Sequence, residues 1–213
     1  EDVFAELFDM VYPVLLKMRE DAVAIPTVFE VETVIAFLYF VREHVDIVIL
    51  ETGMGGREDA TNVVTRPVCT VFASIGMDHM QFLGDTIGKI AYQKAGIIKQ
   101  ECPVVSYPNV PEVCSVLETE WKQCNKNIPE RPEFCVVKRQ DVSGISETIE
   151  GSRFRYKGEE YRISLPGSYQ IYNAVTAIET KLLLDGNVHK EALMNVKWPA
   201  RFECVCTRPL LIR

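Results

Sequence analysis

The sequence contains no run of apolar residues that approaches the roughly 20 needed for a membrane-spanning helix, and no signal-peptide pattern. It also has no cluster of lysine and arginine. The 23 basic residues are outnumbered by 30 acidic ones, which gives a net charge of −7. These absences predict a cytoplasmic protein that binds neither membrane nor nucleic acid.

Paired cysteine motifs are also missing. The chain has 7 cysteines, an odd number, and no two of them form a C-x-x-C pair. This usage is typical of small apolar residues in a reducing compartment rather than of a disulfide framework. Cys204 and Cys206 alternate on an expected strand and so share a face, but this spacing alone does not define a metal site.

A phosphate-binding loop of the form G-x-x-x-x-G-K-[ST] does not occur in the 213 residues. The nearest match is GDTIGKI at 84–90, where only three residues separate the glycines and Ile90 replaces the hydroxyl residue that would coordinate Mg²⁺. An anionic ligand therefore needs another local partner, such as a metal ion or a ring of backbone N–H groups.

Glycine is absent from the first fifty residues, and two helices are expected there. Apolar residues at three- and four-residue steps predict an amphipathic first helix. They are Phe4, Leu7, Phe8, Val11 and Leu15. Thr27, with Glu30 three residues on, forms a capping box for a second helix that runs to about Glu43. That helix is apolar on most sides, so we expect it to be largely buried.

The remaining pattern predicts an α/β fold with a mostly parallel sheet flanked by helices and a small β-hairpin subregion. Expected strands are VDIVIL (45–50), CTVFASI (69–75), PVVSY (103–107) and EFCVVK (133–138), with helices at 86–94 and 111–126. A hairpin turning at Lys157-Gly158 follows. Further helices are expected at 168–184, with Ser168 as a candidate N-cap, and at 189–196, before a final strand.

Glu51 opens the stretch ETGMGGREDATN, directly after an expected strand. Ligands bind at the carboxyl ends of strands in open α/β sheets, and a carboxylate followed by glycines suits Mg²⁺–phosphate chemistry. An ion pair between Glu51 and Arg57 across a surface turn explains the same twelve residues equally well.

Two further candidates follow the second expected strand. His79, in SIGMDHMQFLG, lies just beyond that strand, and Asp78 beside it is a competing metal ligand. Lys94 lies on the next helix among isoleucines and alanines. A partly buried lysine has altered chemistry, whereas the alternative is an ordinary solvated helix residue.

Taken in order, five segments resemble bacterial folylpolyglutamate synthase/dihydrofolate synthase, a family within the Mur ligases. These are PTVFEVETVIAFLYF, DIVILETGMGGREDATNVV, SIGMDHMQFLGDTIGKIAYQKAGIIK, LPGSYQIYNAVTAI and WPARFE. The likeness covers nearly the whole chain, is most specific over 46–99, and is weakest between about 108 and 160.

The resemblance implies an ATP-dependent amide-forming ligase. A folate or dihydropteroate carboxylate attacks the γ-phosphate of ATP, and the amine of L-glutamate then displaces phosphate from the acyl phosphate. The implied cofactors are ATP and Mg²⁺, and the implied state is a monomer.

The same resemblance assigns roles to six residues. Glu51 and His79 match metal-binding residues, and His79 and Lys94 match catalytic positions, Lys94 being the lysine that becomes carbamylated. Gln170 and Asn173 match the motif that reaches the nucleotide, and Arg201 matches an arginine directed at the ATP phosphates.

Departures from the family pattern give further expectations. The family's P-loop is not found here, so we expect residues 1–197 to form a central ligase domain that is incomplete at its N-terminus. Residues 198–213 are expected to be a linker and the first strand of a truncated C-terminal domain, and the 213 residues alone to be inactive. Tyr169 stands where the family usually has histidine, and Thr52 and Glu58 replace commoner apolar residues.

Three alternatives remain at this point. One is another Mur-type ligase that joins a different carboxylate and amino acid. Another is a non-catalytic fragment or scaffold that works with a partner chain. The third is a binding domain that needs no metal, which titration with Mg·ATP would test.

Overall fold

The computed structural model describes residues 1–199, 204–207 and 210–212, the last two ranges by their backbone only. The chain divides into two compact units, residues 1–65 and 66–213, and each is described by itself. Among the described residues, no helix is both long and apolar enough to cross a membrane.

The first unit contains the two expected helices, α1 (Asp2–Glu20) and α2 (Val28–Arg42), and a short 3₁₀ helix η1 (Ala60–Val63). The capping box is confirmed: the Thr27 hydroxyl accepts from the Glu30 N–H at 3.2 Å, and the Glu30 carboxylate accepts from the Thr27 N–H at 2.6 Å. The expected burial of α2 is wrong, because only Thr33 and Ile35 of this helix are buried. The helix packs against α1 and η1, and these leave most of its apolar side chains exposed or half-buried.

The expected strand at 45–50 is also wrong. The VDIVIL segment has no strand conformation, and Ile49 is 97% exposed. A strand requires a hydrogen-bonding neighbour, and the described residues of 1–65 include no other strand that could pair with it. Hydrophobic β-branched residues alone do not supply that partner.

The second unit is built on the expected parallel sheet. Strands β1 (Thr70–Phe72), β2 (Val104–Ser106) and β3 (Phe134–Val136) pair in that order, with Thr70 opposite Val104 and Val104 opposite Phe134. Helices α3 (Met80–Leu83) and α4 (Ile87–Ala95) lie between β1 and β2, and α5 (Pro111–Cys124) lies between β2 and β3. Each strand is shorter than its apolar run suggested, and α3 had no counterpart in the prediction.

One core joins α4 and α5 to the parallel sheet. Ile90, Val104, Val113 and Leu117 are fully buried in it. Thr86 caps α4 by accepting from the Lys89 N–H, and Gly96 is the C-cap of this helix.

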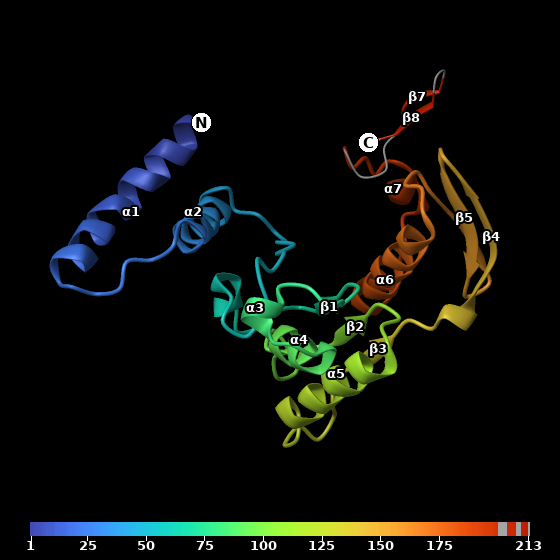
Figure 1. Ribbon diagram of the computed structural model, residues 1–213, viewed down its shortest axis with the longest axis horizontal. Coiled ribbons are helices and arrows are strands. Elements are labelled where there is room, and N and C mark those ends of the chain that lie inside the picture. The colour runs from blue at the N-terminus through green and yellow to red at the C-terminus, as the bar shows by residue number, and fades with distance from the viewer. Residues whose placement is uncertain (200–203, 208–209, 213) are drawn as a thin grey trace. The chain divides into compact units, whose positions relative to one another are not determined.

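A second core lies between helix α6 (Ser168–Asp185) and an antiparallel sheet of β4 (Val142–Thr148), β5 (Gly151–Tyr156) and β6 (Glu159–Ile163). The β5–β6 hairpin turns at Lys157-Gly158, as predicted, whereas β4 was not foreseen. The N-cap of α6 is Gly167, so the expectation for Ser168 is wrong. Figure 1 shows α6 running between the two sheets of this unit.

Near its end the chain forms α7 (Lys190–Met194) and the strand pair β7 (Cys204–Thr207) and β8 (Leu210–Ile212). The register shifts between Cys204 and Cys206. Regular two-residue alternation is therefore interrupted between these two cysteines.

Candidate functional site

The carboxyl ends of β1, β2 and β3 lie at one edge of the parallel sheet, because parallel strands share one direction. The segment after β1 contains His79, and the segment after β2 contains Asn109. This edge of the second unit is where α/β proteins of this type bind ligands.

Glu51 lies in the first unit, exposed, in the loop that precedes η1. Its carboxylate makes no hydrogen bond or ion pair within the described part of the chain. The alternative of a surface ion pair with Arg57 therefore has no support in the structure. A carboxylate without a protein partner is available to an external cation.

Asp59 organises the loop in which Glu51 lies. One of its oxygens accepts from the Met54 N–H at 2.7 Å, and the other accepts from the Thr61 N–H at 3.0 Å and from the Thr61 hydroxyl at 2.6 Å. Burial acts to raise the pKa of the Asp59 carboxyl, but the hydrogen bonds from Met54, Thr61 and Gly53 outweigh it, so the pKa is lowered. The loop is thus closed around an ionised carboxylate.

Glycines give this loop its tight path. Gly55 has φ 71, in the left-handed region. A Cβ built on Gly53 would lie 2.4 Å from the ring of Phe29 on α2, so the loop lies directly against that helix.

His79 lies at the N-cap of α3 with φ 50, an unusual backbone conformation for a residue with a side chain. The Asp78 carboxylate accepts from the His79 N–H at 2.8 Å, and its other oxygen lies 3.6 Å from His79 Nε2. Both side chains are at least half exposed. Asp78 and His79 therefore present oxygen and nitrogen donors side by side.

Lys94 is half-buried in the last turn of α4, between the buried Ala91 and Ala95. Its amine has no hydrogen-bond or ion-pair partner within the described residues. The partial burial of Lys94 that the sequence predicted is confirmed. Its amine forms no ion pair with another described residue.

Gln170 and Asn173 lie in the first two turns of α6 and contact each other, Asn173 Nδ2 donating to Gln170 Oε1 at 2.9 Å. Gln170 is buried and Asn173 is half-buried. This bond fixes the orientation of both carboxamides, leaving the Gln170 amino group and the Asn173 oxygen for another partner. Arg201 lies outside the described residues.

The implied Mg²⁺ fits the donors that are present. Within the described part of the chain, no three His, Cys, Asp or Glu side chains gather into a metal-binding group. Mg²⁺, however, usually takes only one or two ligands from protein and completes its shell with water and phosphate. Glu51 in the first unit, which has no protein partner among the described residues, and the exposed pair Asp78–His79 in the second unit each supply donors of that kind.

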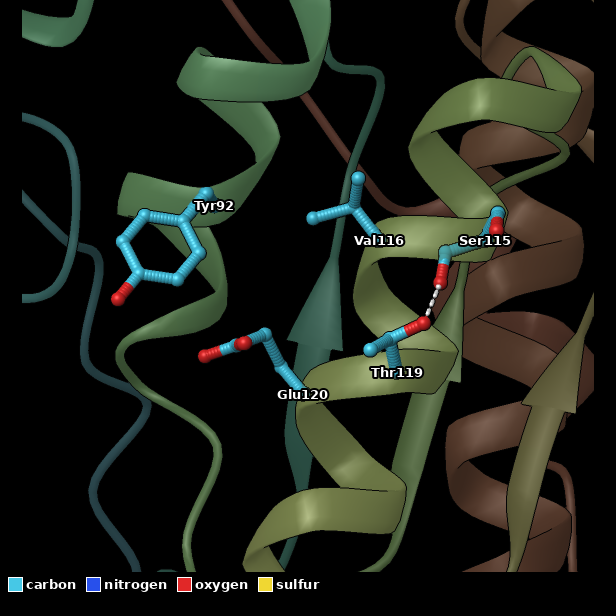
Figure 2. A pocket seen from close by; sticks show the side chains of 5 residues that line it. All are labelled: Tyr92, Ser115, Val116, Thr119 and Glu120. Atoms are coloured by element: carbon cyan, nitrogen blue, oxygen red, sulfur yellow. Dashed lines mark hydrogen bonds between the residues drawn. The ribbon is translucent and has the colours of Figure 1, made fainter.

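A shallow hollow on the second unit lies elsewhere. Figure 2 shows Tyr92 of α4 and Ser115, Val116, Thr119 and Glu120 of α5 around it. The Thr119 hydroxyl donates to the Ser115 carbonyl at 2.8 Å, so it serves its own helix. None of the candidate residues lines this hollow, and we assign the chemistry to the strand ends instead.

Two polar clusters in the structure were not predicted from the sequence. The Arg139 guanidinium lies 4.4 Å from the ring centre of Tyr172 and 5.8 Å from that of Tyr107. Lys157 and Cys135 meet at the buried Glu179 of α6. Both clusters join residues far apart in sequence, so no local pattern signals them.

The second unit has an α/β fold with a parallel sheet, the architecture in which ligands bind at the carboxyl ends of strands. The family model for the Mur ligase middle domain matches residues 9–180, and the chain belongs to that family. The fold class expected from the sequence is confirmed by solved structures of the same architecture.

Within this family, the chain is similar to folylpolyglutamate synthases. The chain is 38% identical over 198 residues to the dihydrofolate synthase/folylpolyglutamate synthase of Bacillus subtilis, covering 86% of this chain and 45% of that protein. It is similar to the folylpolyglutamate synthase of Mycobacterium tuberculosis complexed with ADP, with TM-score 0.82 and 27% identity over 99% of this chain and 49% of the other. An FPGS–AMPPCP–folate complex gives TM-score 0.82 and 28% identity, covering 98% and 53%. The chain thus spans about half the length of the relatives it matches.

Proposed function

We propose that this chain provides the central metal- and nucleotide-binding part of an ATP-dependent ligase that adds L-glutamate to a folate or dihydropteroate carboxylate. The observation that carries the proposal is the 38% identity to a dihydrofolate synthase/folylpolyglutamate synthase over 86% of the chain. Structural similarity to an FPGS complex with AMPPCP and folate supports the same substrates. In this proposal residues 1–197 form one ligase domain, and residues 198–213 lead out of it.

The proposed reaction has two steps. The substrate carboxylate attacks the γ-phosphate of ATP and releases ADP, giving an acyl phosphate. The amine of glutamate then attacks the acyl carbon, loses a proton and displaces inorganic phosphate. Mg²⁺, when bound, neutralises the charge on the phosphate oxygens.

The chain's own residues have distinct roles in this scheme. Glu51 and His79 would hold the metal, and Asp78 would orient His79. Carbamylation of the Lys94 amine would turn it into an oxygen ligand. The Gln170–Asn173 pair on α6 presents its remaining amide donors and acceptor to the adenine ring. Arg201 is assigned to the ATP phosphates.

The test measures ATP-dependent incorporation of labelled glutamate into folate and dihydropteroate by the natural polypeptide that contains these residues. Glu51→Ala and His79→Ala should each lower the rate by two or more orders of magnitude and raise the Mg²⁺ concentration required. Glu58→Ala, an exposed neighbour in the same loop, is the control. An unchanged rate and Mg²⁺ dependence in the Glu51→Ala/His79→Ala double variant would refute the assignment. Activity only with another carboxylate or amino acid would favour a different Mur-type ligase.

A further inference from the structure

Hydrogen bonding between the β1 and β2 segments continues beyond the last bond between their backbones. That bond runs from the Tyr107 N–H to the Phe72 carbonyl, at 2.8 Å. Beyond it, the side chain of Asn109 reaches across to the segment after β1. Its Oδ1 accepts from the Ile75 N–H at 2.8 Å, and its Nδ2 donates to the Ala73 carbonyl at 3.1 Å.

A carboxamide carries the same donor and acceptor as a peptide group. Asn109 therefore extends the ladder by two hydrogen bonds where the backbone has turned away after β2. The same Nδ2 lies 3.3 Å from the Ser106 hydroxyl and from the Tyr107 carbonyl, so the side chain is held at its base as well. The Asn109 N–H also donates to the Tyr107 carbonyl, at 2.7 Å.

The segment that Asn109 fixes leads directly to the candidate metal ligand. Residues 73–75 belong to no strand. After them Gly76 accepts from the Asp78 N–H at 3.0 Å, and His79 follows with its left-handed backbone. Nothing lies within 4 Å of a Cβ built on Gly76, so packing at that residue does not fix the path. Within the described part of the chain, Asn109 thus makes the last cross-strand hydrogen bonds before Asp78 and His79.

We propose that Asn109 is a positioning residue for the metal site: it fixes residues 73–75 and thereby sets where Asp78 and His79 present their donors. This inference rests on the proposed function, because it assigns the His79 segment to Mg²⁺. Residues that orient metal ligands from behind are often nearly as important to metal affinity as the ligands themselves.

A matched control exists at the opposite end of the same sheet. Asn125 is fully buried, accepts from the Glu101 N–H at 2.9 Å and donates to the Trp121 carbonyl at 3.0 Å. Replacing either asparagine by alanine removes hydrogen bonds of the same kind to the backbone. Only Asn109 is connected to the segment that leads to His79.

The experiment compares Asn109→Ala, Asn109→Asp and Asn125→Ala with the natural polypeptide. The first readout is amide hydrogen exchange at Ile75, and the second is binding of Mn²⁺ with AMPPCP, followed by water proton relaxation. Asn109→Ala should expose the Ile75 amide and weaken Mn²⁺ binding about tenfold, the lower end for loss of an orienting partner. Asn125→Ala should change neither, although it lowers the melting temperature.

Asn109→Asp keeps the acceptor for Ile75 but loses the donor to Ala73, and it serves if the alanine variant does not fold. It should retain protection of the Ile75 amide and show a smaller loss of Mn²⁺ affinity. Wild-type Mn²⁺ affinity in both Asn109 variants, with Asn125→Ala unchanged, would overturn the positioning role alone. Absence of Mn²⁺ binding in the unmodified protein would instead overturn the proposed function together with this inference.

Discussion

Lys157 Nζ lies 2.8 Å and 2.9 Å from the two carboxylate oxygens of Glu179, whose side chain is only 7% exposed. The contact at Oε1 lacks hydrogen-bond geometry, whereas that at Oε2 has it. The hydrogen bond to Glu179 is the main cause that raises the pKa of Lys157. Because Lys157 forms the β5–β6 turn and Glu179 belongs to α6, this ion pair links the hairpin to the helix.

Lys157→Met should destabilise the second unit by about 1–3 kcal/mol, because it leaves a buried carboxylate without its cation. Adding Glu179→Gln should recover part of that loss, since the unpaired charge is then gone. Urea unfolding of the single and double variants measures both effects. Lys122→Met, which breaks an exposed Lys122–Glu118 pair of 2.6 Å on α5, is the control and should cost less. Equal losses in the two lysine variants would contradict the prediction.

Cys135 should react slowly with iodoacetamide at pH 8. Burial first, and then the Glu179 carboxylate, which accepts from the thiol at 3.4 Å, together raise the pKa of the Cys135 thiol to about 11. Glu179→Gln should lower the pH at which Cys135 becomes alkylated. Mass spectrometry of the Cys135 peptide across pH 8–11 measures the shift, and Cys114, which has no contact with Glu179, serves as the internal reference. A Cys135 midpoint that does not move would show that the charge of Glu179 has little effect.

Asp59→Ala should open the loop at 53–61 at neutral pH. It removes the hydrogen bonds that this carboxylate accepts from Met54 and Thr61, so we expect a loss of about 1–2 kcal/mol in the first unit. The pKa of Asp59 is lowered in the folded protein, so its stabilisation is fully present above the unfolded pKa of about 3.9 and is lost as pH falls through the folded pKa.

The variant should accordingly be less sensitive to acid below about pH 4 than the parent. Hydrogen exchange at the Met54 and Thr61 amides reports the loop directly, and Glu58→Ala is the control. Unchanged protection at both amides in Asp59→Ala would show that other contacts hold the loop.

Thr27→Ala should destabilise α2 by about 1 kcal/mol, because the hydroxyl accepts from the otherwise unpaired Glu30 N–H. Thr27→Ser keeps the hydroxyl and should restore most of the loss. Denaturant unfolding with hydrogen exchange at the Glu30 amide distinguishes local fraying of the helix start from global unfolding. Faster exchange in the serine variant, equal to that in the alanine variant, would argue against the cap.

Local signals in the sequence located most elements of the fold. Thr27 with Glu30 and Lys157-Gly158 each act within a few residues, so the capping box and the hairpin turn were predictable. The VDIVIL segment was not, because its state depends on a strand partner that composition does not reveal. The predicted burial of α2 was wrong for a related reason. An apolar helix sequence predicts burial, but it does not show which element would cover the helix.

The candidate site divides in the same way. Glu51 and His79 became candidates because each follows an apolar run, and Lys94 because its neighbours are apolar; their roles stay predictions. Asn109 was missed, although a polar residue between Pro108 and Pro111 just after a strand is a usable signal. Glu179 was missed because its partners Cys135 and Lys157 come from other elements, and only the folded chain brings them together.

Helix α6 has a wider consequence for how the second unit loses its structure. Its residues Ile171, Val175 and Ile178 belong to the core under β4–β6, while Glu179 and Tyr172 contact residues of the parallel sheet region, Cys135 and Tyr107. If α6 separated from either sheet, the apolar face of that sheet would become exposed to solvent. The two sheets should therefore melt together, in a single cooperative transition, although they share no strand.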